Sequence, residues 1–394
     1  MKTLRDFNFY NKRVLVRADF NVSFGDDGRV DDKEDWRLKA TLPTINYLLN
    51  QKAKIILLSH LGRPDGRAVE ELRMDPIGQR ISQLIGQPVK KLDNCIGPEV
   101  EQAIKKMEAG QVVLLENVQF HSGEKENSPA YIESLANLAD FFVMDAFGQA
   151  HRDYASISGL PKRLPGCAGL LLEKEVKVLS EILEKPKCPL VVIIGGVKIS
   201  TKIKMIEHFL EKADSLILGG ALANIVIRAK GLAIGRSIIE EEMVEEAQKM
   251  ELTNIKLHLP VDVIVSVDSG GEASSRIAPV GNISDQEMIL DIGPDTIELF
   301  KRIISGAEMI VWNGPMGLFE TEKFAAGTKA IAEAIAQGQA FSLVGGGDTI
   351  NCLNQLGLLD KIDHISTGGG AMLKFLSGEK LPGIEALKIT NIEQ

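Results

Sequence analysis

The sequence predicts an α/β protein of two Rossmann-like domains. Each domain is expected to be a doubly wound parallel sheet, the two are joined by a helix, and their ligand-binding edges face an interdomain cleft. Apolar runs of strand length alternate with helix-like segments along the whole chain, and this alternation is typical of parallel sheets covered by helices. A long helical segment interrupts the alternation near the middle of the chain. The length of 394 residues also exceeds what one ordinary hydrophobic core accommodates.

The first half of the chain repeats a unit of one strand and one helix. Its strand candidates are residues 13–18, 54–60, 111–116 and 141–147. Proline in the first turn marks the expected starts of three helices, at Asp75-Pro76, Gly97-Pro98 and Ser128-Pro129. This half is expected to form the first domain, residues 1–169.

Residues 170–185 are expected to form one long helix, because apolar residues recur there at helical spacing and Pro186 follows. This connecting segment is placed at residues 170–186. Beyond it the strand candidates are residues 188–196, 215–220, 261–267, 309–314 and 341–346. They are expected to build the second domain, residues 187–371.

Composition and charge exclude several classes of protein. The chain is 44% hydrophobic and 25% charged, as in ordinary globular proteins, and no apolar stretch approaches the ~20 residues of a membrane span. The net charge of −9 argues against nucleic acid as a partner. Four scattered cysteines without metal-binding spacing, and the lack of a signal-peptide core in residues 1–13, favour a cytoplasmic location.

Four strand-like runs in the second half end in glycine beside polar residues. They lie within residues 191–202, 309–320, 341–349 and 364–370. Glycine allows backbone to approach a ligand closely, and ligands of open α/β sheets sit at the carboxyl ends of the strands, where helix N-termini suit phosphate. The pattern therefore predicts a phosphate-bearing ligand.

The polar residues of these runs are the candidates for contacts with that ligand. Lys198 and Lys202 are four apart and are expected on one face of an opening helix turn, where the helix dipole disfavours cations unless a polyanion binds. Asp348 follows three glycines and fits either a helix N-cap or a carboxylate that holds magnesium. Glu320 fits either a ribose contact or a helix cap.

Arginines gather at strand ends in the first half. The candidates are Arg17, Arg37, Arg63 and Arg152, and several guanidiniums at one sheet edge suit a phosphate or carboxylate better than separate surface ion pairs. Asp19 and Asn21 fit contacts to a hydroxyl, an Asx-stabilised turn, or both. For His60 and His151, hydrogen bonding to an anion is favoured over a general-base role.

Missing motifs narrow the function further. No GxxxxGK[ST] is present, no GxGxxG follows a strand, and the protein-kinase motifs are absent. The chain is therefore neither a P-loop enzyme nor a typical dinucleotide dehydrogenase.

Together the motifs resemble phosphoglycerate kinases from end to end. The matching blocks include RVLVRADFNV, DWRLKATLPTI, SHLGRP, LLENVQFH, DAFGQAHR, IGGVKISTKI, WNGPMGLFE, VGGGDT and STGGGAMLKFLSG. The resemblance implies phosphoryl transfer from 1,3-bisphosphoglycerate to Mg-ADP, giving 3-phosphoglycerate and Mg-ATP in glycolysis. It also implies that residues 372–394 return to the first domain.

The resemblance further implies the residues of each site. The phosphoglycerate-binding set is Asp19, Phe20, Asn21, Arg37, His60, Leu61, Gly62, Arg63, Gln119 and Arg152. The nucleotide-binding set is Lys198, Lys202, Gly293, Glu320, Gly346, Gly347, Asp348 and Thr349, with Asp348 on Mg²⁺. Arg37, Lys202 and Gly369 are the expected catalytic residues. The expected partners are these small molecules, without nucleic acid or membrane, and the chain is expected to be a monomer.

One residue departs from the family pattern at the substrate site. Gln119 stands where the family usually has an arginine that contacts the non-transferring phosphate. A non-catalytic or weakened family member that binds nucleotide or phosphoglycerate is therefore the alternative, although Arg37, Lys202 and Asp348 argue against it. An NAD-dependent oxidoreductase, the third candidate, lacks its phosphate fingerprint.

Overall fold

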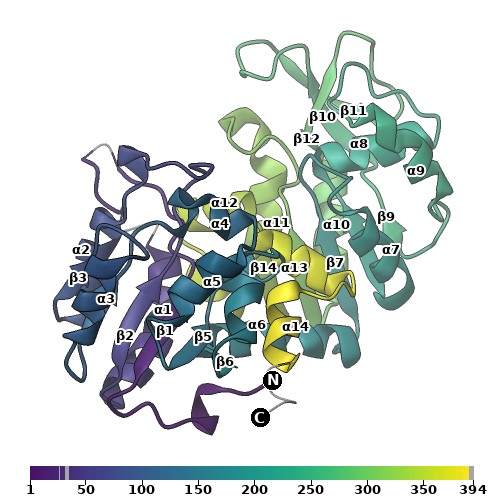
Figure 1. The fold of residues 1–394 in the computed structure, drawn as a ribbon. Coiled ribbons are helices and arrows are strands. Elements are labelled where there is room, and N and C mark those ends of the chain that lie inside the picture. The colour runs from purple at the N-terminus through teal and green to yellow at the C-terminus, as the bar shows by residue number, and fades with distance from the viewer. Residues whose placement is uncertain (26, 32–34, 390–394) are drawn as a thin grey trace. The chain divides into compact units, whose positions relative to one another are not determined.

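The computed structural model describes residues 1–25, 27–31 and 35–389. Its contacts divide the chain into two compact units, Met1–Lys177 with Lys380–Gln394, and Val178–Glu379. Both are α/β units built on six-stranded sheets, which confirms the predicted fold class (Figure 1). Helix α6 (Leu170–Glu184) carries the chain from the first unit into the second. The predicted domain limits stay predictions; by its contacts, the segment 372–379 groups with the second unit.

The first unit is built on a parallel sheet with the strand order β3-β4-β2-β1-β5-β6. Its strands are β1 (Arg13–Arg17), β2 (Lys54–Leu58), β3 (Val89–Lys91), β4 (Val112–Leu114), β5 (Phe141–Met144) and β6 (Gly166–Ala168). The four predicted strands are present. The two edge strands escaped prediction because neither forms an apolar run: β3 contains two lysines, and β6 reads Gly-Cys-Ala.

Helices cover this sheet. They are α1 (Trp36–Asn50), α2 (Asp75–Ile85), α3 (Pro98–Lys105), α4 (Ser122–Lys125), α5 (Pro129–Ala136) and α14 (Pro382–Ile389). The three prolines predicted to open helices lie in the first turns of α2, α3 and α5. Helix α14 packs against residues 155–159 and β6, and the Gly383 N–H donates to the Ala150 carbonyl at 2.9 Å.

The second unit has a parallel sheet with the order β15-β14-β13-β7-β8-β9. Its strands are β7 (Leu190–Ile194), β8 (Ser215–Leu218), β9 (Leu257–His258), β13 (Met309–Asn313), β14 (Phe341–Gly345) and β15 (His364–Ile365). Its helices are α7 (Ile203–Lys212), α8 (Gly220–Ala229), α9 (Val244–Lys249), α10 (Pro294–Ser305), α11 (Ala326–Gln337), α12 (Gly347–Gln355) and α13 (Gly369–Leu376). The core strands β7, β13 and β14 are buried almost throughout, as their unbroken apolar runs predict.

The prediction for residues 261–267 was wrong in part. Strand β10 (Asp262–Ser266) does form there, but it lies in a separate antiparallel sheet between β11 (Ser275–Pro279) and β12 (Met288–Ile292). Strand β11 is exposed at four of its five residues, as antiparallel sheets allow and buried parallel sheets do not. A short β-branched run fits either sheet, so its sequence does not distinguish them.

Parallel order determines where a site can form. The carboxyl ends of all six strands of each large sheet meet at one edge, and the segments that follow them carry most of the predicted site residues. Gly293 is different, because it follows β12 of the antiparallel sheet. Among the described residues, no helix combines the length and apolar character that crossing a bilayer requires.

Candidate active site

In the second unit, the loops after β7 and β13 are joined backbone to backbone. The Gly195 N–H donates to the Asn313 carbonyl at 2.9 Å and the Gly196 N–H to the Pro315 carbonyl at 2.8 Å. A Cβ on Gly195 would lie 2.1 Å from the Pro315 oxygen, and one on Gly220 would lie 2.7 Å from the Gly196 nitrogen. Because no side chain fits at such distances, glycine is required at these strand ends.

The Lys202 amine lies in the space that these glycines leave. The side chain is 9% exposed, and its Nζ donates to the Gly195 carbonyl at 2.5 Å. A Cβ on Gly314 would lie 2.7 Å from this Nζ. Burial lowers the pKa of Lys202 to about 8, and the negative charge of Asp348 opposes that shift.

The predicted pairing of Lys198 with Lys202 was wrong in its geometry. Helix α7 begins only at Ile203, so both lysines precede the helix and do not lie along one of its faces. Lys198 is exposed, whereas Lys202 is buried. A glycine-rich loop that bends back over the strand end explains the difference.

The third glycine loop follows β14 and opens α12. Gly346, with a φ of 99°, is the N-cap residue, so the N-cap interpretation of Asp348 was wrong. The Thr349 hydroxyl is buried and accepts from the Gly314 N–H at 2.8 Å. Thr349 lies in the first turn of α12, where backbone N–H groups have no partner within the helix. Asp348 lies in the first turn and is exposed, and within the described chain its carboxylate accepts no hydrogen bond.

The N-terminus of α13 lies beside that of α12. A Cβ on Gly369 would lie 3.4 Å from the Gly346 Cα, so the two glycine backbones are in contact. The free N–H groups and positive dipole ends of two helices therefore lie close together. This arrangement suits an anion.

An apolar cavity of about 220 Å³ opens at the same edge of the second unit. Its lining includes Val197, Met288, Leu290, Met316 and Leu318, and among its polar residues are Glu320 and Asp348. Such a cavity suits the flat ring of a small ligand. Glu320 is exposed in a turn outside any helix, so the helix-cap interpretation was wrong for this residue too.

Gly293 lies next to the cavity but does not line it. Its neighbour Ile292 lines the cavity, whereas Gly293 is the N-cap residue of α10 and donates to the Asp262 carbonyl at 2.9 Å. A Cβ on Gly293 would lie 2.3 Å from the Asp262 carboxyl group. Gly293 therefore brings α10 close to β10.

In the first unit, the loops after β1 and β2 interlock around Asp19. Its carboxylate contacts Arg37 Nη1 at 3.1 Å and His60 Nδ1 at 3.8 Å. Asn21 Oδ1 accepts from the Gly62 N–H at 2.8 Å, and the Asn21 N–H donates to Asp19 at 3.3 Å. The Asx-turn interpretation is thus supported for Asp19, whereas the Asn21 oxygen joins the loop after β2. The Asn21 amide nitrogen remains for a ligand.

Cations surround His60. The ring is buried and its pKa is lowered to about 4, chiefly by burial; Asp19 opposes this shift, while Arg17, Arg37 and Arg152 lower the pKa further. His60 is therefore neutral near neutral pH, consistent with hydrogen bonding to an anion. Arg17, one of the arginines that the sequence placed at a strand end, is the last residue of β1 and is fully buried, so its burial is what the apolar strand pattern did not reveal.

The other residues predicted for the phosphoglycerate site differ in their exposure. Arg63 and Arg152 are exposed. Phe20 and Leu61 belong to the hydrophobic core, so they offer backbone groups and not side chains. Gln119 is 5% exposed, and its Oε1 is buried without a hydrogen-bond partner.

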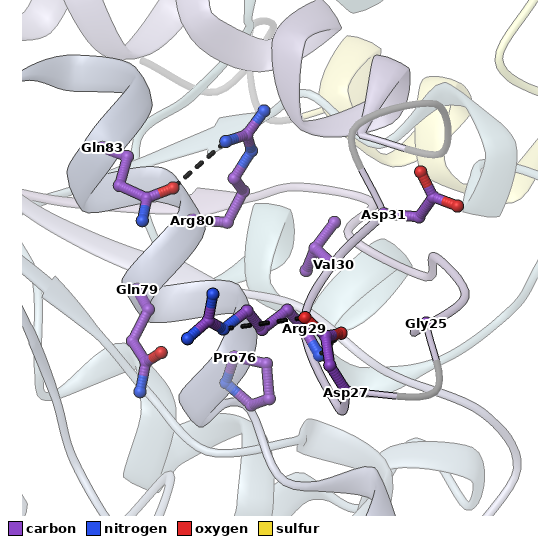
Figure 2. Close-up of a pocket in the computed structure, with 9 residues that line it drawn as sticks. All are labelled: Gly25, Asp27, Arg29, Val30, Asp31, Pro76, Gln79, Arg80 and Gln83. Atoms are coloured by element: carbon purple, nitrogen blue, oxygen red, sulfur yellow. Dashed lines mark hydrogen bonds and ion pairs between the residues drawn. The ribbon is translucent and has the colours of Figure 1, made fainter.

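The first unit also has a cavity, and none of the predicted site residues line it (Figure 2). It lies between the loop around Arg29 and the helix face that carries Gln79, Arg80 and Gln83. Both guanidiniums already have partners: Arg80 contacts Asp35 at 2.5 Å and Arg29 contacts Asp27 at 3.8 Å. This cavity offers no comparable group of free cations.

Comparison with known proteins decides the family. A family model described as phosphoglycerate kinase matches residues 4–379. The chain belongs to the phosphoglycerate kinase family. It is 47% identical to the phosphoglycerate kinase of Moorella thermoacetica, over 98% of each chain, and 45% identical to that of Thermomicrobium roseum, over 98% of this chain and 99% of the relative.

Solved structures of phosphoglycerate kinases have the same fold as this chain. The phosphoglycerate kinase of Coxiella burnetii superposes with a TM-score of 0.85 at 40% identity, over 98% of this chain and 99% of that one. The enzyme of Pyrococcus horikoshii does so with 0.88 at 35% identity over both whole chains. The predicted activity, a glycolytic phosphotransferase with a carboxyl acceptor, is thereby confirmed, and the non-catalytic alternative finds no support.

Nucleotide binding is expected to take up protons at alkaline pH. With a pKa of about 8, the Lys202 amine is mostly charged at about pH 7 and mostly neutral at about pH 9. Phosphate oxygens favour the charged form and raise this pKa on binding. Calorimetry of ADP in buffers of different ionisation enthalpy should show proton uptake at the higher pH and little at the lower.

Lys202→Arg is the matched control, because a guanidinium stays protonated over this range. Its binding should show no such proton uptake. Equal uptake in both proteins would contradict the assignment to Lys202.

Proposed function

We propose that the loops of the first unit bind phosphoglycerate and that the glycine loops of the second unit bind the adenine nucleotide. The burial of Lys202 between the glycine-ended strands β7 and β13 supports the second assignment most strongly. The apolar cavity accommodates the base, Glu320 contacts the ribose, and the N-termini of α12 and α13 bind phosphates. Arg63, Arg152 and neutral His60 bind the anionic groups of phosphoglycerate.

The reaction needs no general base. Either attacking atom, a carboxylate oxygen or a phosphate oxygen of ADP, is already ionised near neutral pH. Catalysis then depends on alignment and on neutralising the charge of the transferred group. We assign that neutralisation to Arg37, Lys202 and the backbone N–H of Gly369. Arg37 is held by Asp19 through one nitrogen, so the rest of its guanidinium remains for the phosphoryl group.

Asp348 would hold the magnesium ion of the nucleotide. Its exposed carboxylate accepts no hydrogen bond within the described chain and lines the cavity beside Lys202, and the described residues contain no cluster of three or more metal-ligating side chains. This fits Mg²⁺, which usually takes few protein carboxylates and keeps waters and substrate phosphates. When bound, the ion neutralises phosphate charge and orients the phosphates.

Transfer requires the two substrates to meet. Since the substrate residues lie on one unit and the nucleotide residues on the other, we infer that a hinge movement brings the units together and excludes water. We further propose that the enzyme acts as a monomer in the cytoplasm.

A coupled assay tests the function. ATP should form when 1,3-bisphosphoglycerate is mixed with ADP and magnesium, and its formation should stop when a chelator removes the magnesium. Binding of both ligands without ATP formation would instead support the weakened family member.

Asp348→Asn is expected to weaken ADP binding by about tenfold, ~1.4 kcal/mol, when magnesium is present and to change it little when magnesium is absent. Calorimetry under both conditions makes the comparison. Asp295→Asn is the control, because Asp295 is also exposed in the first turn of a helix, α10. Equal losses with and without magnesium would argue against a metal ligand.

Gln119→Arg is expected to tighten 3-phosphoglycerate binding by about five- to tenfold, because charged hydrogen bonds contribute roughly 1 kcal/mol more than neutral ones. The nearby Glu116 is already paired with Arg73 at 3.1 Å and Lys91 at 2.7 Å, which leaves the new guanidinium for the ligand. The dissociation constant at low salt is the measurement.

Gln119→Met separates charge from shape at the same position, since it keeps the length of the side chain without donors or charge. It should not tighten binding. If the arginine variant binds 3-phosphoglycerate no better than wild type, Gln119 does not face the phosphate.

A further inference from the structure

A buried polar relay lies behind the phosphoglycerate site. Arg17, the last residue of β1, is fully buried, and its Nε donates to Ser156 Oγ at 2.8 Å. Ser156 Oγ donates in turn to Glu124 Oε1 at 2.6 Å, and the Ser156 N–H donates to Glu124 Oε2 at 3.0 Å. Since a guanidinium only donates and a carboxylate only accepts, the single hydroxyl proton must point to Glu124. Ser156 therefore bridges a buried cation and a buried anion.

The other side of the Arg17 guanidinium faces the site. Its Nη1 donates to the Ala18 carbonyl, next to Asp19. Its Nη2 lies 3.5 Å from Nδ1 of His60. The relay thus runs from Glu124 through Ser156 and Arg17 to the ring that we assign to substrate binding.

This contact determines which ring nitrogen of His60 carries the proton. A proton on Nδ1 would point at a guanidinium that has only donors, so Nδ1 is the acceptor and Nε2 bears the hydrogen. Asp19 Oδ1 would favour the other tautomer, but it lies farther from Nδ1, at 3.8 Å, and accepts from the Asn21 N–H.

We propose that Ser156 and Glu124 are positioning residues that hold Arg17 against His60 and so fix His60 as an Nε2–H donor for the anionic substrate. The proposal rests on the proposed role of His60 in binding phosphoglycerate. It explains why two buried charges are retained behind the site, where each alone would be costly. The lowered pKa of His60, about 4, agrees with a neutral ring that presents one donor.

A neighbouring cluster provides the control. Asn127 Nδ2 donates to Asp153 Oδ1 at 3.0 Å and to Ser158 Oγ at 3.3 Å. This cluster joins the same two chain segments, residues 122–127 and 153–159, and its hydrogen bonds do not involve Arg17. Ser158, like Ser156, is buried in the π-helical turn Ala155–Gly159. Ser158→Ala therefore removes a buried hydroxyl of the same segment and leaves the relay intact.

Nitrogen-15 NMR of the histidine rings tests the proposal, with the His60 signals assigned by their loss in His60→Gln. In wild type, His60 should be the neutral Nε2–H tautomer at neutral pH. In Ser156→Ala it should become a tautomer mixture, and the KM for 3-phosphoglycerate should rise about fivefold to tenfold, as expected when a charge-assisted hydrogen bond is weakened. The KM for ATP should stay within about twofold, and Ser158→Ala should resemble wild type in both measurements.

Three outcomes would overturn the proposal. The first is a wild-type His60 that is protonated on Nδ1. The second is an unchanged His60 spectrum in a folded Ser156→Ala protein. The third is that Ser156→Ala and Ser158→Ala have equal effects. If Ser156→Ala fails to fold, Glu124→Gln, which keeps an acceptor but removes the charge, takes its place with the same expectations. The NMR result does not depend on catalysis, so a wild type with the expected tautomer but no activity would refute the proposed function and leave the relay standing.

Discussion

The close approach of backbone at the ends of β7 and β13 is the constraint on which the proposed nucleotide site depends. Gly195, Gly196 and Gly314 lie so near one another that a Cβ on any of them would meet a neighbouring atom at 3.1 Å or less. The space they leave is filled by the Lys202 amine. A buried cation is costly unless charge compensates it, and the phosphates of a nucleotide supply that charge. The affinity for a polyanion therefore follows from how the strands end.

The proposed phosphoglycerate site differs, because several guanidinium groups lie close together there. Buried carboxylates stabilise them: Asp19 holds Arg37 and faces His60, while Glu124 compensates Arg17 through Ser156. Arg63 and Arg152 are exposed. A chain with a net charge of −9 thus keeps a locally positive site, as expected when local fields and not the total charge determine binding.

Features that depend on local sequence patterns could be predicted from the sequence, whereas features that depend on tertiary contacts could not. The buried strands, the proline-opened helices and helix α6 follow from periodicity and backbone preference, so they were predictable. Strand β10 was assigned to the wrong sheet, because a β-branched run does not reveal its partners. The burial of Lys202, the N-cap role of Gly346 and the core position of Phe20 depend on neighbours distant in sequence. The relay through Ser156 joins residues 32 and 139 positions apart, and no local pattern reports such contacts.

The most direct test of this account is the affinity of Gly314→Ala for ADP with magnesium. The new Cβ would lie 2.3 Å from the Gly195 oxygen and 2.7 Å from Lys202 Nζ, at a φ of +96°. Gly231→Ala carries a similar backbone strain, at a φ of +81°, but its Cβ would meet nothing within 4 Å. The account predicts that Gly314→Ala weakens binding by more than about tenfold, ~1.4 kcal/mol, while Gly231→Ala binds ADP like wild type and both keep their affinity for 3-phosphoglycerate. Wild-type affinity for ADP in Gly314→Ala would contradict the claim that these glycines form the nucleotide site.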